Sequence, residues 1–325
     1  MASILVTGGA GFIGSHLTDA LLGAGHRVVV LDNFSMGNRE NLAQHRGNDR
    51  LQVVEGDVLD EAAVHAACRG CVAVAHLAAA KIPRYGNRLA TLEVNTRGTR
   101  NVLEAARVHQ ARVLLASTSD CYGTNPQVPF SEESFSVVGP SEVARWAYAV
   151  SKLYDEHLCW AYREEHQVSI TIVRYFGSYG PRNHRSWWGG PQAVFIEALL
   201  DGREIELHGD GTQTRSFCYI ADTVAGTVAA LLKPEADGQL FNIGNDQEIS
   251  IAALAALIQR LCGVGGPLPA RLVPYDQIGN RRYQDVARRV PDLSKARRLL
   301  GYAPRVLLEE GLTRTIEWHR AMRGR

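Results

Sequence analysis

The stretch Thr7-Gly8-Gly9-Ala10-Gly11-Phe12-Ile13-Gly14 decides the fold of this chain. The apolar run Ile4-Leu5-Val6 before it is typical of a strand, and apolar residues recur at helical spacing after it, so the segment predicts strand, tight turn and helix. Gly8, Gly11 and Gly14 stand three residues apart across the turn. Without Cβ atoms they let backbone N–H groups approach an anion at the helix N-terminus, where the helix dipole also favours negative charge. The turn therefore predicts a phosphate-binding site.

A glycine-rich loop without a ligand is the alternative that spacing alone leaves open, and Asp32 favours the ligand. Asp32 ends the next apolar run, Val28-Val29-Val30-Leu31. This position is close to the offset of about 20 residues at which an acidic side chain binds the ribose of adenosine. A carboxylate there would repel the 2′-phosphate of NADP. The combined pattern predicts a dinucleotide site that takes NAD.

Composition indicates a globular enzyme. The chain has 325 residues, 46% of them hydrophobic and 21% charged, and a net charge of +1. A core of this size needs no disulfide or metal. We find no basic stripe for nucleic acid or a membrane surface. The densest apolar run, Val72 to Ala80, is too short to span a membrane. The N-terminus begins directly with a strand and does not resemble a signal peptide, so we expect a cytoplasmic location.

The six cysteines raise the question of a metal or redox site. Cys68 and Cys71 form the one close pair, the other four are scattered, and Cys71 stands at the start of an expected buried strand. A metal site of the usual kind requires a second close pair or nearby histidines. We therefore expect no metal or redox role for these cysteines.

Strand-like runs and helical patterns alternate through the first half of the chain, up to Arg174. This alternation predicts an α/β fold with a doubly wound parallel sheet, covered on both faces. Such a fold binds its ligands at the carboxyl ends of the strands. In this chain those ends carry Gly8 to Gly14, Asp32, Asp57, Ala78 to Lys81, Ser117 to Asp120 and Arg174 to Tyr179.

Beyond Arg174 the alternation breaks down. Asp222 and Ser250 are expected to cap helices, and Leu240-Phe241-Asn242-Ile243 is expected to return a strand to the sheet. We therefore predict two domains, each discontinuous in sequence. They are a Rossmann domain of residues 1–173 and 216–246, and a smaller substrate-binding domain of residues 174–215 and 247–325.

Tyr148 and Lys152 carry the expected chemistry. Four residues apart on an expected helix, they share one face. A lysine ammonium beside a phenol, with a nicotinamide cation nearby, stabilises the phenolate and lowers the tyrosine pKa. Such pairs usually lie on a helix surface, but after a dinucleotide turn this one predicts a catalytic base. Tyr148 would take the proton of a sugar hydroxyl while its carbon gives hydride to NAD⁺.

The glycine turn, Asp32, the Tyr148–Lys152 pair and Ser117-Thr118-Ser119-Asp120-Cys121-Tyr122-Gly123 together resemble the extended short-chain dehydrogenase/reductases. More narrowly, they resemble the NAD-dependent sugar-nucleotide epimerases and dehydratases. The resemblance covers nearly the whole chain, including Tyr179 to Arg182, Gly209 to Arg215, Asn242 to Gly244 and Asp292 to Tyr302. It implies a nucleoside-diphosphate sugar, UDP-linked in our prediction, that is oxidised at C4 by bound NAD to a 4-keto intermediate and later reduced.

The resemblance also implies roles for single residues. Tyr148 is the base, Lys152 orients it and binds the nicotinamide ribose, and Ser119 binds the C4 oxygen. Arg215 is expected to bind the diphosphate. Further cofactor contacts are expected from Phe12, Ile13, Asn33, Asp57, Val58, Leu77, Ala78, Ala79, Lys81, Asn95 and Ser117. Further substrate contacts are expected from Lys81, Asp120, Tyr175, Gly177, Arg182, Gln192 and Arg289, with Asp120 also catalytic.

The reaction that follows oxidation stays open between alternatives. Lys81 resembles the lysine of many 4-epimerases, which makes 4-epimerisation our leading prediction. Asp120 and Arg289 resemble residues of UDP-glucuronate decarboxylases, as does Arg145-Trp146-x-Tyr148-x-Val150-Ser151-Lys152. Decarboxylation is therefore the close alternative, ahead of a dehydratase. A non-catalytic NAD-binding regulator would not need the intact catalytic residues, and a redox-only dehydrogenase would require free exchange of NADH.

The chain departs from the family pattern in three places. Gly177 stands where the family has an asparagine that meets the substrate, and Asp120 is shorter than the usual Glu. Trp187 and Trp188 are peculiar to this chain, and we expect them to pack a loop or an interface rather than to stack on the substrate. The resemblance also suggests a homodimer, joined through helices expected at Thr91–His109 and Val143–Glu165.

Overall fold

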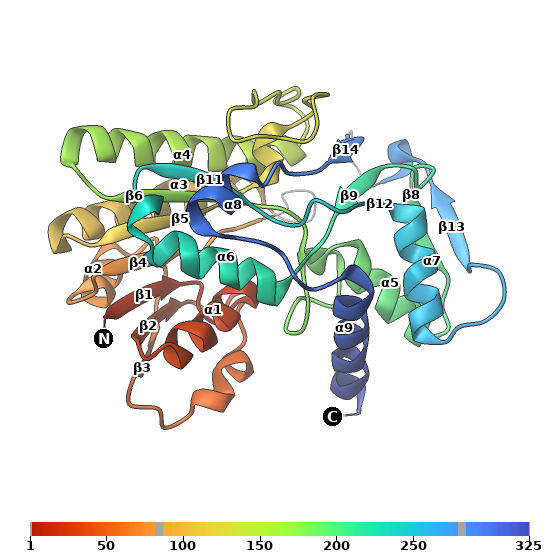
Figure 1. Ribbon diagram of the computed structural model, residues 1–325, viewed down its shortest axis with the longest axis horizontal. Helices are drawn as coiled ribbons and strands as arrows, with labels where there is room; N and C mark the ends of the chain where they lie inside the picture. Colours follow the sequence, from red (N-terminus) through yellow and green to blue (C-terminus); the bar gives the residue numbers. More distant parts are fainter. Residues whose placement is uncertain (1, 82–86, 279–283, 325) are drawn as a thin grey trace.

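The computed structural model describes residues 2–81, 87–278 and 284–324. Its centre is a seven-stranded parallel sheet with the strand order β11-β6-β5-β4-β1-β2-β3 (Figure 1). Its strands are β1 (Ser3–Thr7), β2 (Arg27–Asp32), β3 (Leu51–Glu55), β4 (Ala73–His76), β5 (Arg112–Thr118), β6 (Ile170–Tyr175) and β11 (Gln239–Ile243). The strand order reverses between β1 and β4, where a doubly wound sheet opens a ligand crevice. The predicted α/β fold is confirmed.

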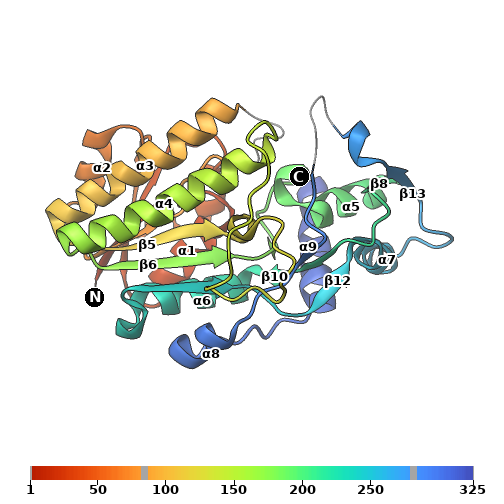
Figure 2. The same ribbon diagram turned by 90° about the horizontal axis from the view of Figure 1, so that it is seen from above.

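Helices cover both faces of this sheet (Figure 2). One face carries α2 (Glu61–Cys68), α3 (Arg88–His109) and α4 (Arg145–His166). The other carries α1 (Phe12–Gly23), α6 (Ile220–Leu232) and α8 (Ser294–Leu300). Alternate residues of β1 enter opposite layers: Ile4 and Val6 pack with the α1 side and Leu5 with the α3 side. A strand buried on both faces must be apolar throughout, which explains the continuous apolar runs of the sequence.

The remaining elements lie beside the carboxyl ends of the sheet strands (Figure 1). The helices are α5 (Pro191–Leu200), α7 (Ile251–Cys262) and α9 (Leu308–Arg323). The strands are β7 (Ser178–Tyr179), β8 (Ile205–His208), β9 (Thr214–Ser216), β10 (Cys218–Tyr219), β12 (Glu248–Ser250), β13 (Ala270–Val273) and β14 (Arg288–Arg289). They form three small sheets, β12-β9-β14, β13-β8 and β10-β7. The exact bounds of the two predicted domains stay a prediction.

Five 3₁₀ helices complete the described elements. They are η1 (Arg39–His45), η2 (Ser119–Tyr122), η3 (Trp187–Gly189), η4 (Pro234–Ala236) and η5 (Tyr275–Gln277). Two of them, η2 and η3, lie at the site described below, so irregular backbone supplies part of its wall.

The two predicted helix caps have different outcomes. Ser250 caps α7 as predicted, since its Oγ accepts a hydrogen bond from the Ala253 N–H at 3.1 Å. The Asp222 cap is wrong, because α6 already begins at Ile220 and Asp222 lies inside its first turn. The Asp222 carboxylate instead accepts from the Val306 N–H at 2.9 Å. It thereby ties the start of α6 to the chain that leads into α9.

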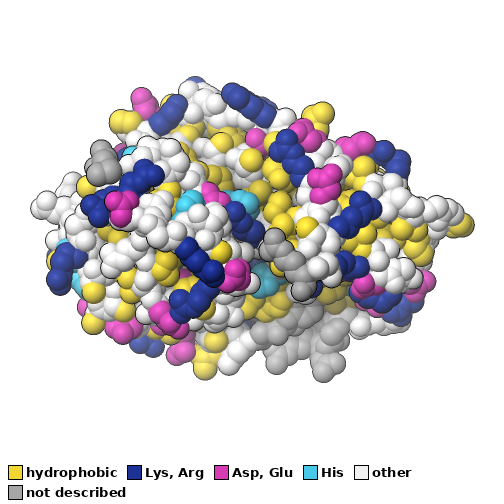
Figure 3. Space-filling model, turned by 90° about the horizontal axis from the view of Figure 1, so that it is seen from below, with side chains coloured by type: hydrophobic (Ala, Val, Ile, Leu, Met, Phe, Trp, Pro, Cys, Tyr) yellow, Lys and Arg dark blue, Asp and Glu magenta, His cyan; other side chains and the backbone are white. Residues whose placement is uncertain are grey.

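The surface shows charges of both signs interspersed, with neither gathering into an expanse on the face seen in Figure 3. This distribution agrees with a net charge of +1. Among the described residues, no helix has the length and apolar character needed to cross a membrane.

The cysteines are buried in the core as free thiols. The Cys71 thiol donates to the Ala67 carbonyl oxygen at 3.5 Å, and burial raises the pKa of Cys68 to about 12. A thiol held protonated in this way is a poor nucleophile and metal ligand. Within the described ranges, no cluster of three or more His, Cys, Asp or Glu side chains has an arrangement suited to a metal ion.

Candidate active site

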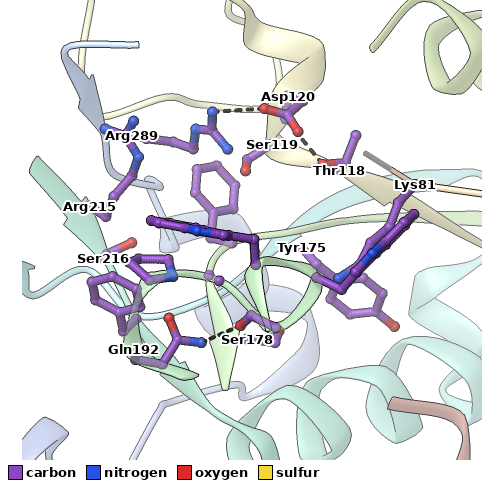
Figure 4. Close-up of a pocket in the computed structure, with 18 of the residues that line it drawn as sticks. Lys81, Thr118, Ser119, Asp120, Tyr175, Ser178, Gln192, Arg215, Ser216 and Arg289 are labelled. Atoms are coloured by element: carbon purple, nitrogen blue, oxygen red, sulfur yellow. Dashed lines mark hydrogen bonds and ion pairs between the residues drawn. The ribbon is translucent and has the colours of Figure 1, made fainter. Parts of the chain in front are cut away.

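A cavity of about 360 Å³ opens at the carboxyl ends of β5 and β6 (Figure 4). Its walls bring together most of the predicted catalytic and substrate-binding residues and a few of the predicted cofactor contacts. From the predicted set they are Phe12, Ile13, Lys81, Ser117, Ser119, Asp120, Tyr148, Tyr175, Gly177, Gln192, Arg215 and Arg289. In Figure 4, Arg215 and Arg289 enter from one side, Lys81 lies on the opposite side, and Ser119 and Asp120 lie along the edge between them.

The glycine turn has the geometry that a pyrophosphate requires. Gly8 adopts φ +70°, and a Cβ on Gly14 would collide with the Gly8 carbonyl oxygen and lie 2.8 Å from the Gly9 Cα. The helix is thus pressed against the turn that precedes it. Within the described residues, no side chain caps the N-terminus of α1, and its first turn holds no acidic residue. The N-terminal N–H groups are therefore suited to an anion, and the turn fits NAD.

Asp32 is fixed beside the turn. Its Oδ2 accepts from the Ala10 N–H at 2.9 Å and its Oδ1 from the Phe34 N–H at 2.8 Å. Asn33 and Asp57, two further predicted cofactor contacts, bind each other: the Asn33 amide donates to the Asp57 carboxylate at 2.8 Å. Val58 follows directly and packs against α3, where the Asn101 amide donates to the Val58 carbonyl oxygen. Asp32, Asn33, Asp57 and Val58 thus lie together at the ends of β2 and β3, where the adenosine is expected.

Asn95 supports the segment that follows β4. Its Oδ1 accepts from the Ala80 N–H at 2.8 Å, and its amide donates to the Ala80 carbonyl oxygen and to the Ser151 hydroxyl. The Ala78 N–H is bonded to the Thr7 hydroxyl at 3.2 Å. The Thr7 and Asn95 side chains, from β1 and α3, therefore hold Ala78 and Ala80 within the segment that contains the predicted contacts Leu77, Ala78 and Ala79. Asn95 itself is buried and acts here as a positioning residue.

The Ser117 hydroxyl is used in a buried hydrogen bond beneath the cavity. It donates to Glu156, and the Glu156 carboxylate also receives two hydrogen bonds from Arg174, at 2.9 and 2.6 Å. All three residues are buried. This ion pair fastens α4 to β5 and β6 beneath the cavity, so it holds the catalytic helix at the strand ends.

Tyr148 and Lys152 both lie on α4, as predicted, but Lys152 has a partner that the sequence analysis missed. Its Nζ donates to the Asp155 Oδ2 at 2.9 Å. Burial, together with the negative charge of Asp120, raises the pKa of Tyr148 well above its usual value. This direction is opposite to the lowering expected with a nicotinamide cation nearby. The chain by itself therefore keeps the Tyr148 phenol protonated.

A chain of ion pairs crosses the cavity. The Asp120 Oδ1 lies 2.7 Å from an Arg289 nitrogen and 3.1 Å from an Arg145 nitrogen. The Asp285 Oδ1 lies 2.8 Å from Arg145 and 2.7 Å from Arg215. The order is Arg289–Asp120–Arg145–Asp285–Arg215, three positive and two negative charges.

Electrostatics in this chain hold Asp120 ionised. Burial alone would raise the pKa of Asp120, but Arg289 and Arg145 outweigh it and keep that pKa far below its usual range. Burial lowers the pKa of Arg289 to about 10, against the opposing effect of Asp120. Burial also lowers the pKa of Lys81, which Asp120 again opposes. Asp120 is therefore an anion that orients arginines, not a proton donor at neutral pH.

Of the predicted substrate residues, Gln192 lies at the cavity and Arg182 does not. Gln192 lines the cavity, and its amide donates to the Gly189 carbonyl oxygen at 2.7 Å. Arg182 is not among the cavity-lining residues, and it donates to Asp19 of α1 at 2.8 Å. The structure does not bring Arg182 to this cavity.

Gly177 has a structural reason to replace the family asparagine. It adopts φ +51°, and an added Cβ would collide with the Ser216 carbonyl oxygen of β9. The backbone of β9 therefore approaches the end of β6 at a distance that excludes a side chain. An asparagine would require β9, which carries Arg215, to move outward.

The two tryptophans belong to the cavity wall. Trp187 and Trp188 both line it, and the Trp187 ring stacks on His208 with ring centroids 4.4 Å apart. The expectation that the two tryptophans pack a loop or an interface is thus incomplete, because Trp187 and the His208 ring that it stacks on also line the cavity.

Asp285 is a cavity residue that the sequence did not indicate, and no local pattern could have singled it out.

Comparisons with known proteins show the family of the chain. The model of the NAD dependent epimerase/dehydratase family matches residues 4–244. A UDP-N-acetyl-alpha-D-glucosaminuronate decarboxylase of Bacillus cytotoxicus is 36% identical over 318 residues, 97% of each chain. UDP-glucuronic acid decarboxylase 1 of Xenopus tropicalis is 40% identical over 319 residues, which cover 98% of this chain and 72% of that protein. A solved UDP-glucuronic acid 4-epimerase of Bacillus cereus, bound to UDP-glucuronic acid and NAD, gives a TM-score of 0.87 at 31% identity, over 98% of this chain and 99% of that chain.

Proposed function

The chain belongs to the NAD-dependent epimerase/dehydratase family, and we propose that it decarboxylates a UDP-linked hexuronate, with UDP-glucuronate as the first choice. It uses NAD and modifies a nucleotide sugar, as the solved and curated relatives do. Two of the curated relatives carry the name of a decarboxylase, which favours this alternative over the 4-epimerisation suggested by Lys81.

The observation that carries the proposal is the placement of Asp120 between Arg145 and Arg289, next to Ser119. A UDP-hexuronate brings a diphosphate and a sugar carboxylate, which are two separate anionic groups. The cavity offers the neighbouring Arg215 and Arg289 on one side for the first and Lys81 on the opposite side for the second (Figure 4). Guanidinium groups bind both kinds of anion in bidentate geometry. The ion-pair chain with Lys81 holds four cations and two carboxylates, so the cavity keeps an excess of positive charge that a second anionic group would balance.

The proposed reaction begins at C4 of the sugar. Bound NAD supplies the oxidation at C4 and the reduction that closes the cycle. Tyr148 takes the proton of the C4 hydroxyl, and Ser119 donates a hydrogen bond to the C4 oxygen. The product is a β-keto acid. Its C5–C6 bond breaks, the electron pair moves into the C4 carbonyl to give an enolate, and carbon dioxide leaves.

The second half restores a saturated ring. A proton must reach C5 of the enolate, and we assign this donation to Arg289, whose pKa is lowered to about 10. Arg289 regains its proton from solvent. When C4 is reduced, Tyr148 returns its proton to the C4 oxygen, so that a UDP-pentose leaves.

The test is to incubate the purified protein separately with UDP-glucuronate, UDP-N-acetylglucosaminuronate, UDP-glucose and UDP-N-acetylglucosamine, and to follow products by NMR. We expect carbon dioxide and a UDP-pentose from the first, or the corresponding acetamido sugar from the second. Inversion at C4 with the carbon count unchanged would show an epimerase and contradict the proposal.

Replacing Arg289 by Gln is expected to lower kcat for formation of the UDP-pentose by about a hundredfold or more, the usual size of a positioned acid–base or electrostatic contribution. Oxidation at C4 should persist, so NADH and a 4-keto sugar should accumulate and be seen by absorbance at 340 nm. Arg288 is the matched control, because it is the neighbouring residue of the same strand, faces solvent and pairs with Glu248. Arg288→Gln should leave kcat within about twofold, whereas equal losses in both variants would remove Arg289 from the mechanism.

We also propose that the chain forms a homodimer through α3 and α4, which lie side by side on one face of the sheet (Figure 2). Apolar side chains are exposed along these helices: Leu89 by 63%, Val150 by 47% and Tyr154 by 45%. Burial of such side chains favours association. Light scattering should give twice the chain mass of 35.6 kDa, and the double variant Val150→Asp/Tyr154→Asp should give one chain mass. A monomeric wild-type protein would contradict this proposal.

A further inference from the structure

The buried pair of Lys152 and Asp155 has no place in the mechanism given above. Both residues lie on α4, three positions apart, and their side chains are 1% and 0% exposed. The Lys152 ammonium lies 2.9 Å from the Asp155 carboxylate. A side chain of opposite charge at this separation, away from water, cancels most of the field that the lysine exerts on its surroundings.

Other polar groups around the pair do not replace Asp155 as a counter-ion. The Thr99 hydroxyl of α3 interacts with the Asp155 carboxylate and lies 3.2 Å from the His76 ring of β4. Burial, with Lys152 contributing, lowers the pKa of His76 to about 3, so this ring is neutral. Glu156 is already bound by Arg174. Burial raises the pKa of Asp155, and the charge and hydrogen bond of Lys152 oppose that rise. Among these groups, Asp155 is therefore the carboxylate that pairs with the Lys152 ammonium.

Tyr148 lies on the same helix, one turn from Lys152. The groups that act on the phenol are Asp120 and Cys121 of η2, Thr118 of β5, and Asp155 of α4. After burial, the negative charges of Asp120 and Asp155 both raise the pKa of Tyr148, and the Thr118 hydroxyl lowers it. Asp120 is itself held by two arginines, whereas Asp155 is the carboxylate that pairs with Lys152, the lysine one helical turn from Tyr148.

We propose that Asp155 is a positioning residue: it holds the Lys152 ammonium and neutralises it, so that Tyr148 keeps its proton until the oxidised nicotinamide adds a positive charge to the site. This inference rests on the role proposed above for Tyr148. Its consequence is that the chain without oxidised cofactor holds an inert phenol. Proton removal from the sugar is thereby coupled to the presence of the electron acceptor.

The first test is Asp155→Asn, which removes the charge and keeps a carbonyl oxygen for the lysine. Because a negative charge no longer opposes the phenolate, the acid limb of kcat against pH should move to lower pH by about one unit. Asp155→Glu should restore the wild-type limb. Glu165→Gln is the matched control, because it removes the same charge from an exposed position on the same helix. It should leave the limb in place.

The second test does not depend on turnover. With the lysine no longer neutralised, the cationic oxidised ring should be disfavoured, so the ratio of dissociation constants, NAD⁺ over NADH, should rise about tenfold in Asp155→Asn. Isothermal titration calorimetry of the cofactor-free protein measures both constants. Asp155→Ala removes the same charge with a smaller side chain, and it carries the same prediction if the Asn variant does not fold.

The outcomes separate this inference from the proposed function. Suppose that Tyr148→Phe is inactive, as the proposed function requires. If Asp155→Asn and Asp155→Ala then leave the acid limb of kcat and the ratio of the NAD⁺ and NADH dissociation constants unchanged, the role of Asp155 alone is overturned. A shift of the limb to higher pH would overturn it as well. Full activity of Tyr148→Phe would overturn the proposed base, and this inference with it.

Discussion

Replacing Tyr148 by Phe is expected to lower kcat for the proposed decarboxylation by about a thousandfold, within the range of about 10² to 10⁴ that a positioned general base contributes. In the proposed mechanism the phenol oxygen takes the proton from the C4 hydroxyl, and phenylalanine keeps the ring but removes that oxygen. KM should stay within a factor of about three, because the substitution leaves Arg215, the residue proposed to bind the diphosphate, in place. Initial rates of carbon dioxide release at saturating UDP-glucuronate measure the effect.

Tyr162→Phe is the control for this substitution. Tyr162 lies on the same helix, but its hydroxyl donates to Glu104 of α3, and it is not among the residues that line the cavity. Its loss should leave kcat within about twofold, whatever it does to stability. A Tyr148→Phe enzyme with more than a tenth of wild-type kcat would show that another group takes the proton.

The direction of the Tyr148 pKa makes this prediction sharper. Burial and Asp120 raise that pKa, so below it the phenol is protonated and unable to act as a base. The rate of the wild-type enzyme should therefore fall as pH falls through the pKa that Tyr148 has with NAD bound. This dependence should be missing from the residual activity of Tyr148→Phe, since the titrating group is gone.

The sheet could be predicted from the sequence because its strands are buried on both faces. The run Val28 to Leu31 lies inside β2, and Leu240 to Ile243 lies inside β11 beside β6, as expected. The 3₁₀ helix η1 was missed. It is a polar segment whose start is held by the Asn38 side chain, which accepts from the Glu40 N–H at 3.0 Å. Such a segment has no apolar periodicity to detect.

Some parts of the site could also be predicted from a single segment of sequence, whereas others depend on how distant strands pair. The glycine turn and the Tyr148–Lys152 pair each lie within one short segment of the sequence, so the geometry of each follows from one turn or one helix. The chain of ion pairs is different, because β9 and β14 lie side by side in a register that places Arg215 next to Arg289. No spacing in the sequence encodes that register. Asp285 was missed for this reason.

Gly177 shows a further limit of reasoning from family patterns. The pattern leads one to expect a missing substrate contact where the asparagine is replaced. The structure shows instead a backbone approach between β6 and β9 that has no room for a Cβ. The absence of a side chain at Gly177 is thus linked to the position of β9, the strand that carries Arg215, through this close backbone approach.

Replacing Gly14 by Ala is expected to weaken NAD binding by about ten- to a hundredfold, since overpacking costs about 1–3 kcal/mol and 1.4 kcal/mol is a factor of ten. The new Cβ would collide with the Gly8 carbonyl oxygen and lie 2.8 Å from the Gly9 Cα. Both are backbone atoms of the turn, so no side chain can rotate away to relieve the contact. The turn must open, and its N–H groups then leave the positions from which they face the pyrophosphate. Titration of the cofactor-free protein with NAD, followed by tryptophan fluorescence, measures the loss.

Gly23→Ala separates this effect from the general consequence of adding a methyl group to α1. Gly23 is the last residue of the same helix, and in the described part of the chain no atom beyond its chain neighbours and the nearby helix backbone lies within 4 Å of its would-be Cβ. Alanine has the higher helix propensity, so this variant should bind NAD as the wild type does and unfold at an equal or higher temperature. Equal NAD affinity in Gly14→Ala and Gly23→Ala would mean that the turn tolerates the methyl group, and the close packing of α1 on the turn would then not be what holds the cofactor.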